Sequence, residues 1–372
     1  MGDADVPHAL EALARVLDEL GIAYAIAGNP VRALGPPDFS ISSLAVSGPR
    51  IVAGGNGPGN TPQVRVGTLR ADSIEWGHAI ELRQPSDPEL EYSPEVALDT
   101  STRQRIAVAR RGESWNESLL VFEELHGTWV RREALPPWRT SGADGFEFEY
   151  GSPLVMHGDE LFTLSSPGSE FEGQKKLGES SSTLLRFQRT EQGWHGTPLP
   201  LNRSVVMLWW GVALTPDGST LALLTRHRGG GYFVDLYLRA GSGFQIGPSI
   251  SVSGTPSGVA CTRSRVVVTS GQVVVLARDQ HGWSLERSIR LPDTEWTVVG
   301  RGTHWSPFAD GHQLVVRRAD PALYLVDVER SGAVRQIVLP SGIDVKSLGA
   351  MAFNESRLFA VLGPEILWWS IA

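Results

Sequence analysis

Short apolar segments recur along the chain at nearly regular intervals. They consist of aliphatic and β-branched residues and are bounded by turn-forming residues. The copies begin at Ile51, Ile106, Leu161, Leu221, Val266, Leu314 and Leu358. A repeat of about 50 residues is the length of one four-stranded blade of a β-propeller. The pattern therefore predicts an all-β chain folded as a seven-bladed β-propeller.

Each copy is surrounded by further strand and turn signals. An earlier strand leads into a tight turn, for which Asp217-Gly218 and Asp310-Gly311 supply residues that accept positive φ. A third strand follows, then a turn with glycine, and several fourth strands end at Leu-Pro, where proline cannot donate to the ladder. The predicted blades span residues 38–85, 91–136, 147–200, 208–252, 255–293, 302–341 and 344–372.

The last predicted blade lacks a fourth strand, and the N-terminal segment supplies a spare one. Residues Ile22–Ala27, with the sequence IAYAIA, have the length and composition of a strand. We expect this strand to complete the last blade and to close the ring without an exposed edge. Residues 8–20 carry leucines at helical spacing, which predicts a short helix before it. Residues 1–30 are thus expected to form an N-terminal helix and a closing strand.

Two segments resemble known propeller repeats. EYGSPLVMHGDELFTLSSPG, from Glu149, resembles an FG-GAP repeat of integrin α-chain propellers, and LTPDGSTLALLT, from Leu214, resembles the WD40-like repeats of bacterial propellers. Both resemblances imply a seven-bladed propeller over residues 38–372. The calcium loop typical of FG-GAP propellers is missing, because Asp144, Glu147 and Glu149 have the wrong spacing for it. We therefore expect no metal and no other cofactor.

Composition narrows the class of protein. The chain has 372 residues, of which 41 are glycine and 24 are proline, as expected for many turns. A net charge of −8 argues against a nucleic-acid partner, and no apolar run is long enough to span a membrane. The single Cys261 excludes an intramolecular disulfide. The first residues show no secretory signal, so we expect a cytoplasmic protein.

Candidates for catalysis are few, since the sequence contains no GxSxG, HExxH or GxxxxGK[ST] motif. His227 lies in RHRGGGY between a second and a third strand, and His304 precedes a first strand. Together with Asp144 and Glu149 they are the possible acid–base groups. The alternative for each histidine is a structural or solvent-exposed role.

Candidates for binding gather at one end of the predicted ring. Loops between second and third strands share that end with the connections between blades, and they are longest in the first four blades. Aromatic residues precede first strands, and arginines end second strands. The candidate binding residues are Tyr92, Tyr150, Trp209, Trp210, Trp305, Arg110, Arg226, Arg228 and Arg317. Aromatic rings and guanidinium groups suit a peptide carboxylate, a sugar or another anionic ligand. Alternatively, the aromatics pack between blades and the arginines are merely solvated.

Three functions are compatible with these features. The first is a non-enzymatic binding or scaffold propeller whose long-loop face takes a protein or peptide partner. The second is an enzyme, such as a lyase, hydrolase or cyclase, that acts on a small molecule at the mouth of the channel. The third is a lectin that binds carbohydrate. Propellers host all three, so the architecture does not choose among them.

Overall fold

The computed structural model describes most of the chain. The described residues are 24–26, 30–82, 94–99, 101–102, 104–109, 119–135, 138–139, 147–167, 183–202, 205–262, 264–270, 272–290, 308–310, 313–317, 323–329, 333–339, 342–354 and 357–370.

The strands within these residues form seven sheets, which we number in chain order. Sheet 1 contains β3 (Ser40–Ser47), β4 (Arg50–Asn56), β5 (Pro62–Leu69), β6 (Ile74–Trp76) and β7 (Ile80–Glu81). Sheet 2 contains β8 (Glu95–Leu98), β9 (Arg105–Ala109), β10 (Leu119–Leu125) and β11 (Thr128–Leu135). Sheet 3 contains β12 (Trp138–Arg139), β13 (Glu147–His157), β14 (Glu160–Pro167), β15 (Thr183–Thr190) and β16 (Gly193–Pro198).

The remaining four sheets follow the same plan. Sheet 4 contains β17 (Val205–Leu214), β18 (Thr220–His227), β19 (Tyr232–Ala240) and β20 (Gly243–Val252). Sheet 5 contains β21 (Gly258–Cys261), β22 (Arg265–Thr269), β23 (Gln272–Asp279) and β24 (Gly282–Arg290). Sheet 6 contains β25 (Phe308–Asp310), β26 (Gln313–Arg317), β27 (Leu323–Asp327), β28 (Val334–Val338) and β1 (Tyr24–Ile26). Sheet 7 contains β29 (Met351–Asn354), β30 (Arg357–Leu362), β31 (Glu365–Ser370) and β2 (Val31–Leu34).

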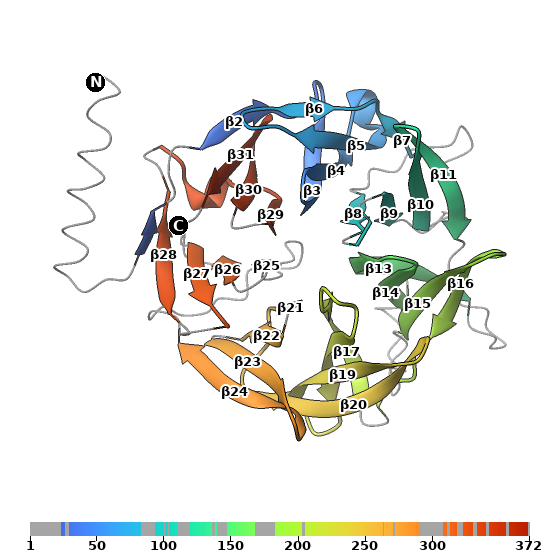
Figure 1. Ribbon diagram of the computed structural model, residues 1–372, viewed down its shortest axis with the longest axis vertical. Coiled ribbons are helices and arrows are strands. Elements are labelled where there is room, and N and C mark those ends of the chain that lie inside the picture. The colour runs from blue at the N-terminus through green and yellow to red at the C-terminus, as the bar shows by residue number, and fades with distance from the viewer. Residues whose placement is uncertain are drawn as a thin grey trace.

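The sheets stand around a common axis in chain order (Figure 1). The first strands lie near the axis, and later strands of each sheet lie farther out; the first strands are β3, β8, β13, β17, β21, β25 and β29. Short 3₁₀ turns occur at η1 (Pro58–Asn60) and η3 (Val345–Ser347). Among the described residues, no helix has the length and apolar character required to cross a membrane.

The hydrophobic core lies between neighbouring sheets. In β9, Ile106 and Val108 pack in a cluster shared with sheet 1, whereas Ala107 and Ala109 pack in one shared with sheet 3. Successive side chains of a strand point to opposite faces, so both faces of this strand are buried. This explains why the second strands are continuous apolar runs and do not alternate with polar residues.

The N-terminal strands differ from the sequence-based prediction. The segment Ile22–Ala27 was expected to complete sheet 7, but its described part, β1, pairs in parallel with β28 on the outer edge of sheet 6. The strand that pairs with β31 is β2, which the sequence did not single out. Val31 and Ala33 pack against the core between sheets 7 and 1, which accounts for the choice of this edge. The predicted helix at residues 8–20 lies outside the described residues.

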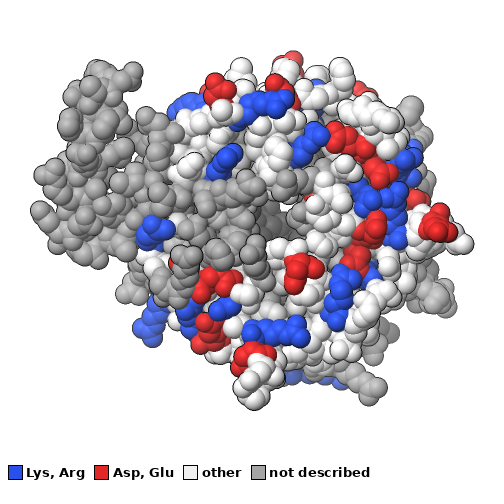
Figure 2. All heavy atoms as spheres, in the orientation of Figure 1, with Lys and Arg blue, Asp and Glu red and all other residues white. Residues whose placement is uncertain are grey.

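The two ends of the molecule differ in how the strands are joined. At one end, the turn end, tight turns connect first to second and third to fourth strands. At the other, the loop end, second strands lead to third strands and one sheet leads to the next. Ion pairs join neighbouring sheets at the turn end: Arg50–Glu124 at 2.6 Å, Arg105–Asp159 at 2.8 Å and Arg265–Glu329 at 3.2 Å. On the face shown in Figure 2, acidic and basic side chains lie next to one another around a central hollow.

A buried carboxylate joins sheets 2 and 3 at the turn end. Asp99 accepts hydrogen bonds from the backbone and hydroxyl of Ser101, from Thr102 and, across the sheet boundary, from the backbone of Gly158 at 2.8 Å. Burial acts to raise the pKa of the Asp99 carboxyl, but the hydrogen bonds from Thr102, Gly158 and Ser101 outweigh it and hold this pKa below its usual value.

We expect Asp99→Asn to lower the free energy of unfolding by about 2 kcal/mol at pH 7, because hydrogen bonds to the charged carboxylate are weakened. A carboxyl whose pKa is lowered by folding stabilises above its unfolded pKa of about 4, and this stabilisation is lost as the pH falls through the folded value. The difference between wild type and variant should therefore shrink at pH 3, as measured by urea unfolding. The exposed Asp72→Asn serves as control, and an equal loss for Asp99→Asn at both pH values would contradict the prediction.

Candidate binding surface at the loop end of sheet 4

The connection between β18 and β19 is a compact loop built on glycine. Gly229 and Gly230 have φ values of 101° and 91°, in the left-handed region that glycine adopts without steric cost. The His227 backbone N–H donates to Gly231 O at 3.0 Å, and the Gly230 N–H donates to His227 O at 3.1 Å. His227 therefore anchors both sides of the loop.

A buried polar cluster lies beneath this loop. His227 Nε2 is 3.2 Å from Asp235 Oδ2, and the Thr225 hydroxyl donates to the same oxygen at 2.9 Å. The Ser249 hydroxyl donates to the other carboxylate oxygen. The exposed fractions of His227 and Asp235 are 6% and 2%. We call these four residues the His–Asp cluster.

Strand register brings the cluster together from three strands. Asp235 on β19 lies opposite Ser249 on β20, and Thr225 on β18 lies opposite Phe233. The His227 ring stacks on Phe233 with centroids 4.0 Å apart and an angle of 14° between planes. Cross-strand partners point to the same face of a sheet, so the cluster occupies one face of sheet 4.

That face of sheet 4 packs against sheet 3. Leu223, directly opposite Asp235, belongs to a core cluster with Leu164 and Leu184 of sheet 3. The hydroxyl of Tyr237, also on this face, donates at 3.0 Å to the carbonyl of Pro200 in the connection between the two sheets. The His–Asp cluster is thus an inter-sheet feature, placed on the second to fourth strands rather than on the strand nearest the axis.

Burial dominates the electrostatics of the cluster. It raises the pKa of the Asp235 carboxyl, against the opposing effect of hydrogen bonds from His227 and Thr225. Burial, together with the nearby Asp235 charge, also raises the pKa of the Tyr237 hydroxyl. The cluster holds one imidazole and one carboxylate, and the described residues contain no group of three metal-ligating side chains.

Two arginines flank the cluster. The Arg226 guanidinium lies 5.9 Å from the centroid of the Tyr232 ring, on the opposite face of sheet 4 from the cluster. Arg228 is exposed on the loop. Within the described part of the chain, neither arginine forms an ion pair with a carboxylate.

The structure describes the side chains of three of the residues singled out from the sequence, and they are neighbours: Arg226, His227 and Arg228. For a second group only the strand position is described: Glu149 and Tyr150 on β13, Trp209 and Trp210 on β17, and Arg317 on β26. A third group lies outside the described residues: Tyr92, Arg110, Asp144, His304 and Trp305.

Some of the second group occupy irregular stretches of inner strands. The pairing of β13 with β14 is interrupted between Tyr150 and Leu154, and that of β17 with β18 between Leu208 and Val212. The tryptophans 209 and 210 fall within the second interruption. β-Bulges re-aim the chain and are common beside binding sites.

Sequence reasoning missed Asp235, Thr225 and Ser249. A signal for Asp235 exists, because an aspartate in the apolar strand FVDLYLR must find hydrogen-bond donors when it is buried. Nothing in the sequence indicates which residue supplies them. That information lies in the register of three strands.

No known protein family matches the sequence, and no curated protein matches it. The fold, however, is similar to several solved structures. Sqt1 of Saccharomyces cerevisiae has a TM-score of 0.52 and 10% identity, over 93% of this chain and 100% of Sqt1. A chain of a mitotic checkpoint complex has a TM-score of 0.55 and 13% identity, over 92% of this chain and 94% of that one. A puromycin hydrolase S511A mutant complexed with PGG has a TM-score of 0.52 and 13% identity, over 90% of this chain and 53% of that one.

The fold is a β-propeller. The four-stranded antiparallel sheets around one axis and these likenesses agree on that. At 10–13% identity the likenesses concern the fold alone.

Proposed function

We propose that this propeller is a non-enzymatic binding module that presents its loop end to a protein or peptide partner. The observation that carries the proposal is the pair of arginines beside the β18–β19 loop at the loop end. At the turn end, several arginines pair with carboxylates, many of them on neighbouring sheets. At the loop end, Arg226 and Arg228 flank the β18–β19 loop without such pairing among the described residues.

The chemistry of this surface suits a peptide. A guanidinium group forms paired hydrogen bonds with a carboxylate, and an adjacent aromatic ring adds apolar contact. Arg226 over Tyr232 supplies both elements, and Arg228 adds a second cation on the loop. The partner expected on these grounds exposes an acidic or C-terminal carboxylate. A cytoplasmic location and the absence of a nucleic-acid partner remain predictions from the sequence.

We further infer that the seven sheets are seven blades of one ring, closed by β2 beside β31. The repeat period of the sequence supports this count, as does the pairing of an N-terminal strand with the last described one. The FG-GAP-like segment falls on β13 and β14, and the WD40-like segment on the end of β17 and on β18. Both segments are hairpins of first and second strands.

A capture experiment with matched variants tests the binding function. The variant Arg226→Ala/Arg228→Ala is expected to lose the proteins that wild type retains from a lysate, at least tenfold by quantitative mass spectrometry. The control, Arg70→Ala/Arg278→Ala, removes two exposed arginines at the turn end and should retain them. If the loop-end variant and the control capture the same proteins as wild type, the proposal is wrong.

One observation favours an enzyme as a second candidate. His227 contacts a carboxylate, as a general base oriented by an acid would. The pair is buried between sheets, and both oxygens of Asp235 already accept hydroxyl hydrogen bonds. If the protein is an enzyme, His227→Gln should abolish turnover of its substrate. If it is a binding module, His227→Gln should leave partner capture unchanged.

A further inference from the structure

The His–Asp cluster has a property that the binding function alone does not require. It can take up a proton. With neutral imidazole and ionised carboxylate, the pair carries one buried negative charge. With imidazolium and carboxylate, or with imidazole and carboxylic acid, it carries no net charge. Burying net charge costs free energy, so the closed, buried state should bind this proton more tightly than a state open to water.

The loop is mechanically tied to that pair. The backbone of His227 forms hydrogen bonds to Gly230 and Gly231, so the residue whose imidazole contacts Asp235 also holds the base of the loop. Gly229 and Gly230 provide the backbone freedom for such a movement. Arg228 moves with the loop because it directly follows His227.

We propose that the His227–Asp235 pair is a pH-dependent latch, which holds the β18–β19 loop closed when it has taken up a proton and releases the loop when it loses it. This inference rests on the proposed function only in assigning the loop to the binding surface. The closed fraction rises as the pH falls, by the linkage of proton uptake to conformation.

No other described group near the pair reverses the expected rise of the closed fraction at lower pH. On the same face, Tyr237 stays neutral because burial raises the pKa of its hydroxyl. Thr225, Ser249 and Asn202 are uncharged, and the sheet 3 residues of this core, such as Leu164 and Leu184, are apolar. The described cations next to His227 in the sequence are Arg226, on the opposite face, and Arg228, on the exposed loop.

Trypsin cleavage after Arg228 reports on the latch in the full chain and needs no partner. When opening is fast relative to cleavage, the rate follows the open population. We expect cleavage after Arg228, relative to cleavage after the exposed Arg70 in the same molecule, to rise about tenfold between pH 6 and pH 8.5. A tenfold change corresponds to about 1.4 kcal/mol in the balance between the closed and open states. Normalising to Arg70 removes the pH dependence of trypsin itself.

Variants separate the latch from a purely structural role. His227→Gln can still donate a hydrogen bond to Asp235 but does not titrate, so its cleavage ratio should stay within twofold across this pH range. The exposed His281→Gln should keep the slope of wild type. A flat ratio in wild type, or a wild-type slope in His227→Gln, would overturn the latch. The wild-type measurement tests the latch even if His227→Gln does not fold. Because partner capture is not part of this assay, failure of the latch and failure of the proposed function are distinguishable.

Discussion

Glu160→Gln is expected to lower the free energy of unfolding by about 4 kcal/mol. Glu160 is 6% exposed and pairs with Arg186 of its own sheet and with Arg239 of sheet 4. Removing the charge of one partner from a buried ion pair leaves the other buried and uncompensated, which costs about 3–5 kcal/mol. Urea unfolding at pH 7 measures the effect.

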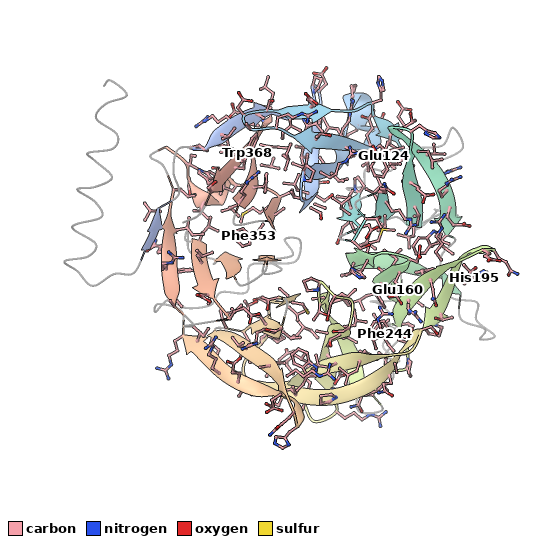
Figure 3. All side chains as sticks on the ribbon, viewed as in Figure 1. Glu124, Glu160, His195, Phe244, Phe353 and Trp368 are labelled. Carbon is pink, nitrogen blue, oxygen red and sulfur yellow. The ribbon has the colours of Figure 1, made fainter. Side chains whose placement is uncertain are left out.

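The surroundings of Glu160 explain why neither arginine can escape to water at low cost. Arg186 also donates to the carbonyl of Ser242, and Arg239 donates to the carbonyl of Gly218 at 2.7 Å. Both guanidinium groups lie over the ring of Phe244, at 5.7 and 4.6 Å from its centroid. Figure 3 shows Glu160 and Phe244 at the boundary between sheets 3 and 4.

The matched control is Glu75→Gln, which breaks the exposed pair between Arg70 and Glu75. Solvent screens exposed pairs and their contribution is small, so the unfolding midpoint of this variant should match that of wild type. A midpoint for Glu160→Gln that also matches wild type would show that the buried pairs do not join the two sheets energetically.

Deleting residues 1–36 is expected to cost about 4 kcal/mol, and deleting residues 1–29 much less. The longer deletion removes β2, whose four residues pair with β31. Four pairs at about 0.5–1 kcal/mol of hydrogen bonding each, with the partial burial of Val31 and Ala33, give this sum. Of the described residues, the shorter deletion removes those of β1, which pairs three residues at the outer edge of sheet 6.

The two deletions distinguish the role found for β2 from the role expected for Ile22–Ala27. If the earlier segment completed sheet 7, the shorter deletion would carry most of the loss. Thermal and urea unfolding of both chains, together with light scattering, provide the comparison. The longer deletion should also aggregate, because β31, which contains Trp368, then becomes an uncovered edge. Equal midpoints for the two deletions would contradict the assignment.

Much of the architecture could be predicted because local signals agree with it. The strands beginning near Ile51, Ile106, Leu221 and Val266 are apolar runs bounded by turns, and they form second strands β4, β9, β18 and β22. The closing strand could not be predicted in the same way. IAYAIA has a stronger strand composition than VRAL, and only the packing of Val31 and Ala33 between sheets selects the latter for β31.

The candidate site was predictable in part. The arginines and the histidine of RHRGGGY are visible in the sequence as a polar, glycine-rich interruption between two apolar runs. The acidic partner of His227 could not be predicted, because the only indication is a single aspartate eight residues later on the neighbouring strand. Pairing between strands fixes that contact, and a list of residue types does not contain it.

The pairing of β2 with β31 also bears on how the chain is made. Arg32 and Glu365, which form an ion pair between these strands, are 333 residues apart. At about 5–20 residues per second, a ribosome takes tens of seconds to add the second partner after the first. Sheets 1 to 5 can assemble in that interval, while sheet 7 waits for the last strand. The pairing of β2 with β31 is therefore a late step in the formation of this fold during synthesis.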